Sequence, residues 1–398
     1  MNKKFIILAT VFVDVLGMGI IIPTLPFYVE SFGVSAFTIT MLFCIFAFFS
    51  FFSAPILGSL SDKYGRRPVM IASIFSTAIG WLVFASATNL WLLFLGRTID
   101  GLAAGNFSTA QGIMTDIAKD EKDRTKNLGM MGAVFGIAFI IGPAIGGLLS
   151  NISPTFPFWI VGFMAILNLI NVIFNLPETH TIRNSDSKIS LNPLMPIIRI
   201  LRDRMILPRF SVWFLFGLTV SIQQAVFALY LGKVFSLGAF ASGVFLTGLG
   251  VIITLNQGFL LSKFWLKRFK ESQLELIMTV IFAIGFLLMS TSLLGIFIAG
   301  LIFITFGQSV LRVVLTSQIA GNSHERRGEV LGAMTSAMSV AMIIGPLMGG
   351  ALFVSHTKWP FLISGILSVI SFFILVADRK SLKKVSPIIE PVNDQTIV

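Results

Sequence analysis

Long apolar stretches separated by short polar segments run through most of this chain. Each is close to the roughly 20 apolar residues that a helix needs to cross a bilayer. Their centres lie near residues 17, 47, 79, 102, 139, 166, 220, 248, 284, 306, 341 and 368. We therefore predict an all-α membrane protein with twelve transmembrane helices. The first stretch contains an acid and is followed by many others, so we interpret it as a retained span and not as a cleaved signal peptide.

The longest polar stretch, residues 177–208, divides the predicted spans into two groups of six. We interpret it as a connector between an N-terminal bundle, residues 1–176, and a C-terminal bundle, residues 209–378. A short amphipathic helix is expected within it, around 196–204. Residues 379–398 are predicted to form a disordered tail.

An internal repeat supports this division. When the chain is shifted by 203 positions, the segment 140–143 (IIGP) falls on the identical segment 343–346, and the glycine pair 146–147 falls on 349–350. Chance agreement between two glycine-rich apolar segments is the alternative, but the match continues without a gap for more than thirty positions. Parallel six-helix repeats are a known transporter architecture, in which the substrate site lies between the halves near the membrane midplane.

Charge is scarce and placed on one side of the predicted membrane. Only 12% of the residues are charged, against about 25% in a soluble protein. The net charge of +11 could indicate a nucleic-acid partner, but nearly all lysines and arginines fall in segments on one side of the spans. This asymmetry predicts that both termini are cytoplasmic and that the protein is a multi-pass protein of a bacterial cytoplasmic membrane. We expect no nucleic-acid partner.

Residues that could perform enzymatic or metal chemistry are few. The single cysteine, Cys44, lies in an apolar run, and all three histidines fall in predicted loops. The sequence contains neither the HExxH nor the GxSxG motif. We therefore predict no enzymatic activity and no cofactor or metal. A non-transporting receptor with the same fold stays an alternative.

The segment 58–68 reads GSLSDKYGRRP and lies between the second and third predicted spans. Glycines permit close helix approach and a tight turn, and a carboxylate is stabilised near a helix N-terminus. The segment resembles the signature of the major facilitator superfamily at its usual place, although a generic basic loop is the alternative. The matching residues are Gly58, Asp62, Gly65, Arg66 and Arg67.

The corresponding segment of the second half, residues 258–268, has Ser262 where Asp62 would stand. This difference predicts a single charged latch between the halves. We hypothesise that Asp62 closes onto the start of the eleventh helix near Gly328.

Two further segments extend the resemblance to the drug exporters of that superfamily. In the fifth span, Gly142, Pro143, Gly146 and Gly147 resemble the antiporter motif of the proton-driven members, although small-residue packing and a proline bend explain the same residues. The first span, from Asp14 to Pro26, is similar to the opening helix of the tetracycline–proton antiporters.

The resemblance leaves the substrate open. Those antiporters carry an aspartate in the third span, where this sequence has Gly80, and another in the ninth, where residues 276–294 contain no acid. Glu275 lies only at the edge of that span.

Four ionisable residues fall inside the predicted spans: Asp14, Arg97, Asp100 and Arg312. A charge at mid-bilayer costs at least about 2.5 kcal/mol, so such residues usually face a cavity or a partner. Arg97 and Asp100 lie three apart and can pair on one helical face, as a structural ion pair or as part of proton coupling. Asp14 has no partner in its own span and is the preferred proton carrier. The alternative is a hydrated acid near the cytoplasmic end.

The second half offers amides where the first offers acids. Amides orient ligands through hydrogen bonds but carry no proton near neutral pH. We predict that these residues and one arginine shape the substrate cavity: Gln223, Gln224, Asn256, Gln257, Gln308 and Arg312.

The residues and the resemblance together predict a secondary transporter that exports small amphipathic compounds in exchange for protons. Its partners would be the substrate, protons and lipid, and we expect a monomer. A metabolite or sugar transporter of the same fold is the alternative.

Overall fold

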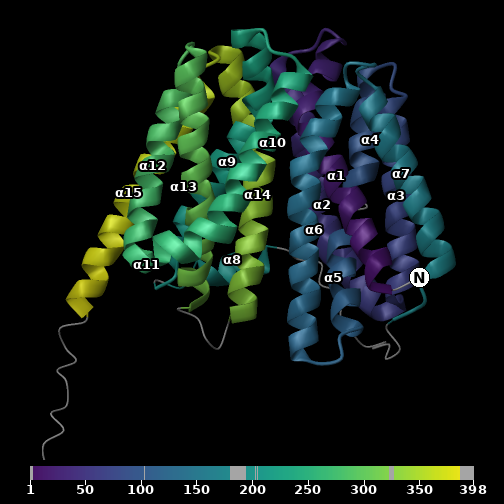
Figure 1. Ribbon diagram of the computed structural model, residues 1–398, viewed down its shortest axis with the longest axis horizontal. Helices are drawn as coiled ribbons and strands as arrows, with labels where there is room; N and C mark the ends of the chain where they lie inside the picture. The colour runs from purple at the N-terminus through teal and green to yellow at the C-terminus, as the bar shows by residue number, and fades with distance from the viewer. Residues whose placement is uncertain are drawn as a thin grey trace, which may run out of the picture.

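The computed structural model describes residues 3–102, 104–179, 194–201, 203, 205–321 and 327–385, and these residues form a bundle of helices without a β-strand (Figure 1). The all-α prediction is confirmed. The helices of the first half are α1 (Lys3–Glu30), α2 (Ala36–Tyr64), α3 (Arg66–Ala85), α4 (Leu90–Leu102), α5 (Asn106–Asp116), α6 (Glu121–Leu149) and α7 (Phe156–Asn175).

A short connecting helix, α8 (Met195–Ile200), precedes the second half. The helices of that half are α9 (Leu207–Phe235), α10 (Ala239–Leu255), the π-helix η1 (Asn256–Trp265), α11 (Leu266–Arg268), α12 (Glu271–Met289), α13 (Leu294–Gly321), α14 (Arg327–Ser355) and α15 (Trp359–Val385).

Eleven helical spans in the described part of the chain are long and apolar enough to cross a membrane. The fourth predicted span is instead broken into α4 and α5, of 13 and 11 residues, which together make one crossing. The break lies where glycines bring the chain against α2. A Cβ atom at Gly101 would lie 2.9 Å from the carbonyl oxygen of Phe46, and one at Gly105 would lie 2.5 Å from Cβ of Leu57.

The eighth crossing is continuous from α10 through η1 to α11, Ala239–Arg268. Its π-helical part coincides with hydrogen bonds to α13, because Asn256 Nδ2 donates to Ser309 Oγ at 2.6 Å and Gln257 Nε2 donates to the Ser309 carbonyl at 3.0 Å. π-Helices are rare and occur mostly as single-turn bulges inside α-helices, frequently at functional sites. The segment 258–268 is therefore helical.

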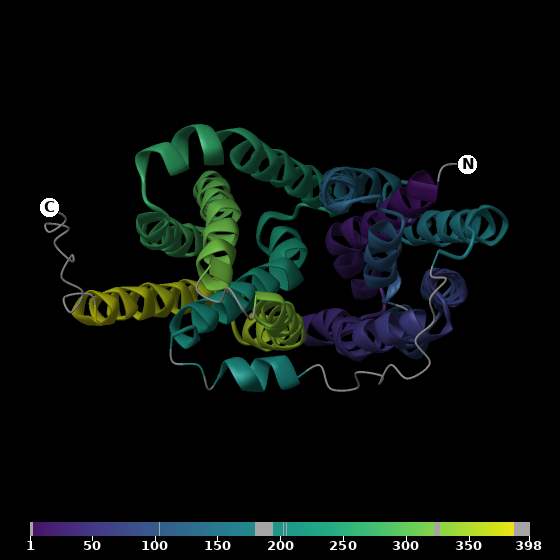
Figure 2. The same ribbon diagram turned by 90° about the horizontal axis from the view of Figure 1, so that it is seen from below.

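The crossings alternate in direction, so all connections gather at two ends of the bundle. We call the end that holds Lys3, Tyr64, α8 and the last turn of α15 the basic end, and the other the opposite end (Figure 1). Seen from the basic end, α8 lies at the periphery beside α14 (Figure 2).

Two boundaries differ from the prediction. The connecting helix ends at Ile200, whereas a helix to 204 was expected. Helix α15 continues to Val385, so the predicted tail boundary at 379 lies inside a helix. Lysine, arginine and leucine are good helix formers, so a helix can continue past the apolar run. The rest of the predicted tail, 386–398, and part of the connector, including 180–193, lie outside the described residues.

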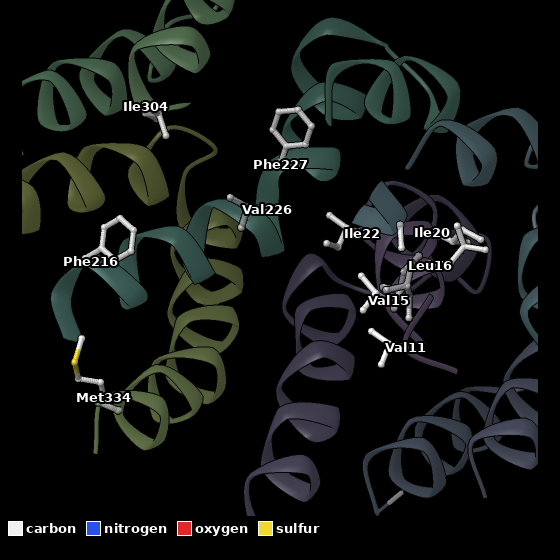
Figure 3. Packing of buried hydrophobic residues seen from close by; sticks show 14 of the residues in the cluster. Val11, Val15, Leu16, Ile20, Ile22, Phe216, Val226, Phe227, Ile304 and Met334 are labelled. Atoms are coloured by element: carbon white, nitrogen blue, oxygen red, sulfur yellow. The ribbon is translucent and has the colours of Figure 1, made fainter. Parts of the chain in front are cut away.

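Helices α1 and α9 are the central helices of the two halves. Within their most apolar windows, 67% of the residues of α1 and 78% of those of α9 are buried inside the protein. Figure 3 shows buried side chains of both helices, among them Val11, Val15, Leu16 and Ile20 of α1 and Phe216, Val226 and Phe227 of α9. Polar residues on these two helices therefore stand close to the interface between the halves.

The internal repeat is visible in the packing of α6 and α14 on these central helices. A Cβ atom at Gly142 of α6 would lie 2.9 Å from Cα of Gly19 in α1, and one at Gly345 of α14 would lie 2.6 Å from Cβ of Ser221 in α9. The second glycines of the pair contact the other half. Gly147 lies against Ala239 and Phe240 of α10, and Gly350 lies against Phe37 and Thr40 of α2.

Close approaches between the halves lie at the opposite end and near the middle of the helices. They include the two glycine contacts above, the approach of Gly243 to Pro143, and a 2.9 Å hydrogen bond from Thr247 Oγ1 to the Ile140 carbonyl. The structure is therefore closed at the opposite end.

Candidate functional site

The first predicted element of the site, the pair Arg97–Asp100, lies on one face of α4. Arg97 Nη1 is 2.8 Å from Asp100 Oδ2, and the side chains are only 4% and 9% exposed. The guanidinium also stacks over the ring of Phe46 in α2, at 4.2 Å from the ring centroid. Cation–π contact and the carboxylate together hold this buried arginine in place. The spacing of three residues brings the two side chains together as predicted.

Asp14 lies on α1, is half-buried and interacts with α4 and α5. Its carboxylate is hydrogen-bonded to the Asn106 side chain and is close enough to Asp100 for electrostatic repulsion. Asn106 in turn donates to Thr77 Oγ1 of α3 at 3.4 Å, while its own Oδ1 has no hydrogen-bond partner. The structure thus joins all three predicted coupling residues in one polar cluster. We call Asp14, Arg97, Asp100 and Asn106 the acidic cluster.

Asn106 was missed in the sequence. The only signal in the sequence was an amide inside an apolar stretch. Nothing in the neighbouring sequence indicated that this amide would contact a carboxylate. The break between α4 and α5 places it opposite α1, and that break depends on contacts with α2.

A cavity of about 530 Å³, including the part open to solvent, lies between the halves. Three of the predicted amides, Gln223, Gln224 and Gln308, line it. The remainder of its wall is Thr305 and apolar residues from α1, α6, α9, α10 and α13: Ile22, Phe139, Pro143, Leu246, Leu249, Gly250, Ile253, Leu301 and Ile304. The cavity is thus apolar, with a few amide and hydroxyl groups that can orient a ligand.

The other predicted cavity residues occupy different positions. Asn256 and Gln257 use their amides to attach η1 to α13, so they act in packing and do not line the cavity. Arg312 lies on α13 one turn beyond Gln308, on the same face. It is not among the residues that line the cavity.

The segment 58–68 is tied into the first half at the basic end. Arg66 lies 2.6 Å from Asp62 and 3.0 Å from Asp116 at the end of α5, and it donates to Ser61 Oγ at 2.7 Å. Gly65 has a φ of 107°, which favours glycine and allows the turn between α2 and α3. In this structure Asp62 therefore pairs with its own segment, and the predicted closure onto α14 near Gly328 stays a prediction.

Glu178 was missed in the sequence and fixes the same turn. Its two carboxylate oxygens accept hydrogen bonds from the backbone N–H groups of Arg66 and Arg67, at 3.0 and 3.2 Å. These are first-turn N–H groups of α3, which have no partner inside the helix. Glu178, three residues past the end of α7, thus caps the start of α3. No sequence signal marked this contact, because 112 positions separate Glu178 from Arg66.

A second buried ion cluster lies in the other half, near the basic end. Arg209 of α9 is 3.2 Å from Glu275 of α12 and 2.8 Å from Asp378 of α15, and all three side chains are less than 9% exposed. The sequence placed Glu275 only at the edge of a span and did not predict this cluster. The cluster connects three helices of one half, and we interpret it as structural.

Comparisons with known proteins agree with this architecture. The family model of the Major Facilitator Superfamily matches residues 7–274 and 257–394. The tetracycline resistance protein, class C, of Escherichia coli is 28% identical over 90% of this chain and 91% of its own length. The quinolone resistance protein NorA of Staphylococcus aureus is 27% identical over 90% and 92%. The crystal structure of the nucleoside transporter NupG superposes with a TM-score of 0.79 at 16% identity, covering 96% of this chain and all of that one.

Proposed function

The chain belongs to the Major Facilitator Superfamily, and we propose that this membrane transporter exports small amphipathic compounds in exchange for protons. The observation that carries the proposal is the acidic cluster, in which a half-buried carboxylate, Asp14, lies beside a tightly paired one, Asp100. Two relatives named for tetracycline and quinolone resistance support the choice of drug-like substrates.

The two carboxylates suit different roles. Asp100 is held by Arg97 at 2.8 Å, so protonating it would leave a buried guanidinium without its counter-ion. Asp14 is bound by a neutral amide and is partly exposed, so its charge can change at lower cost. We therefore assign proton uptake and release to Asp14 and a supporting role to the pair.

The cavity favours amphipathic compounds over sugars. A sugar presents a ring of hydroxyl groups, each of which needs a polar partner when it leaves water. The cavity wall offers three amides and one hydroxyl among mostly aliphatic groups, which suits a ligand with a large apolar surface. A metabolite or sugar transporter is the second candidate, and it would need polar partners beyond these four.

Alternating access would follow from exchange between two arrangements of the halves. The present arrangement is closed at the opposite end. The positive-inside rule places the basic end in the cytoplasm, so this state would bind substrate from the cytoplasmic side. The proton gradient would supply the energy without a cofactor, and we propose that a monomer carries out the cycle.

Proteoliposomes test the coupling assignment. We expect the wild-type protein to accumulate a tetracycline or a quinolone under an imposed pH gradient, and an uncoupler to abolish accumulation. Asp14→Asn should lose accumulation at least tenfold while still exchanging labelled for unlabelled substrate without a gradient. Glu30→Gln, an exposed acid on the same helix, serves as the control and should behave like the wild type. Full accumulation by the Asp14→Asn, Asp100→Asn double variant would show that coupling lies elsewhere.

A further inference from the structure

Arg312 of α13 lies within the depth of the membrane. The helix runs from Leu294 to Gly321, so Arg312 lies about five residues past its middle, or about 7 Å along the axis. The hydrocarbon core extends about 15 Å on each side of the midplane. A guanidinium at this depth needs a specific reason to be there.

Helical periodicity places Arg312 on the cavity side of α13. The α13 residues that line the cavity include Leu301, Thr305 and Gln308, and Arg312 follows them by 11, 7 and 4 residues. At 3.6 residues per turn these intervals return to nearly the same direction. The exposed apolar residues Ile302 and Phe303 lie on other faces of the helix. Arg312 therefore lies on the face of α13 that carries Gln308, one turn further along the helix than the last cavity-lining residue.

The Arg312 side chain is exposed and, among the described residues, has neither an ion-pair nor a hydrogen-bond partner. The two buried arginines of the spans are paired instead: Arg97 with Asp100, and Arg209 with Glu275 and Asp378. None of the described residues that line the cavity is acidic. A cation one turn from an apolar, amide-bearing cavity has the chemistry to attract a negatively charged group.

We propose that the substrates of this cavity are organic anions, in which an apolar or aromatic body occupies the aliphatic pocket and an acidic group binds Arg312. The inference rests on the proposed function only in taking this cavity as the substrate site. A guanidinium offers two parallel N–H donors that match a carboxylate or sulfonate. Gln308, one turn away, can donate a further hydrogen bond to the same group.

Two fluorescent naphthylamines separate the charge from the apolar body. 8-Anilinonaphthalene-1-sulfonate carries a sulfonate, and N-phenyl-1-naphthylamine has the same ring framework without it. Binding of each is measured by equilibrium dialysis against the full-length protein in lipid nanodiscs, with empty nanodiscs subtracted. We expect the wild type to bind the sulfonate at least tenfold more tightly than the neutral compound.

Variants assign this preference to one side chain. Arg312→Gln should lose the preference and bind the neutral compound as before, whereas Arg312→Lys should keep part of it. Arg268→Gln, which removes an exposed positive charge outside the cavity, should keep all of it. Gln308→Leu should weaken the sulfonate less than Arg312→Gln does. An unchanged preference in Arg312→Gln, or no preference in the wild type, would overturn the inference.

Transport distinguishes this inference from the proposed function. Sulfonate binding that depends on Arg312, together with uptake that ignores the pH gradient, would preserve the anion site and refute proton antiport. Gradient-driven export of neutral or cationic dyes that is unaffected in Arg312→Gln would preserve antiport and refute the anion site.

Discussion

At the scale of single residues, the ionisable groups in the spans are stabilised in different ways. Arg97 has a carboxylate and an aromatic face, and Arg209 lies between two carboxylates. Asp14 has an amide, and Arg312, one turn beyond the cavity-lining Gln308, has no partner among the described residues. A buried ion pair is worth little compared with apolar packing, but removal of one partner leaves an uncompensated charge. Paired residues should therefore govern folding, and the residues without an ionic partner should govern coupling and binding.

The Arg97–Asp100 pair gives a prediction about stability. Arg97→Ala should lower the free energy of unfolding by about 3–5 kcal/mol, because Asp100 then remains buried without its counter-ion. Adding Asp100→Asn should recover part of that loss, since it removes the stranded charge. Thermal denaturation of the detergent-solubilised protein would measure both effects, with Arg268→Ala as a control at an exposed position. Additive losses in the double variant would mean that the two residues do not interact.

At the scale of elements, the sequence GPxxGG performs the same packing role twice. In α6 it packs on α1 and α10, and in α14 it packs on α9 and α2. Each copy attaches one helix both to its own central helix and to the opposite half. The residues that resemble an antiporter motif therefore have a packing role. This role does not require them to take part directly in proton coupling. The last glycine of each copy contacts the other half. A larger side chain at this position should therefore hinder movement of one half against the other more than a larger side chain elsewhere in the motif.

Gly147→Val should prevent closure of the opposite end. A Cβ atom there would lie 2.9 Å from the Ala239 carbonyl oxygen and 3.0 Å from Cα of Phe240, both backbone atoms that cannot move aside alone. We expect transport to fall at least tenfold. A reporter thiol introduced by Gln224→Cys, in a Cys44→Ser background, should become reactive from the opposite end.

The control for this prediction is Leu148→Val in the same turn of α6. Leu148 is 58% exposed, so the same β-branched side chain there should have little effect on transport. If the thiol of Gln224→Cys stayed unreactive from the opposite end in the Gly147→Val protein, that end would still be closed. Such a result would contradict the role assigned to this contact.

The sequence predicted the helices better than it predicted their partners. Apolar length alone located the eleven long spans of the described residues, and the repeat predicted a division into two halves. The break after Leu102 was missed, because hydropathy does not report that two glycines lie against α2. Spacing along one helix predicts which side chains share a face, so the pairing of Arg97 with Asp100 was predicted correctly. Contacts such as Glu178 with α3 or Asp378 with α9 join distant positions that only the fold brings together.

At the scale of the whole molecule, the distribution of charge and the direction of closure lead to one orientation. Both described chain ends and most basic segments lie at the basic end, whereas the close contacts between halves lie at the opposite end. If the basic end is cytoplasmic, as the positive-inside rule predicts, the cavity of this state is closed to the outside. An exporter requires such a state to load substrate from within the cell.

The orientation can be measured with single cysteines in a Cys44→Ser background. Ser355 is exposed at the opposite end of α14, and Glu121 is exposed at the basic end of α6, with 89% of its side chain accessible. A membrane-impermeant maleimide added to intact cells should label Ser355→Cys and leave Glu121→Cys unlabelled. In inside-out vesicles the two should exchange behaviour, which controls for differences in reactivity. Neither substitution alters a charge inside a span, so insertion should be unaffected. Labelling of Glu121→Cys in intact cells would reverse the orientation, and the closed end would then face the cytoplasm.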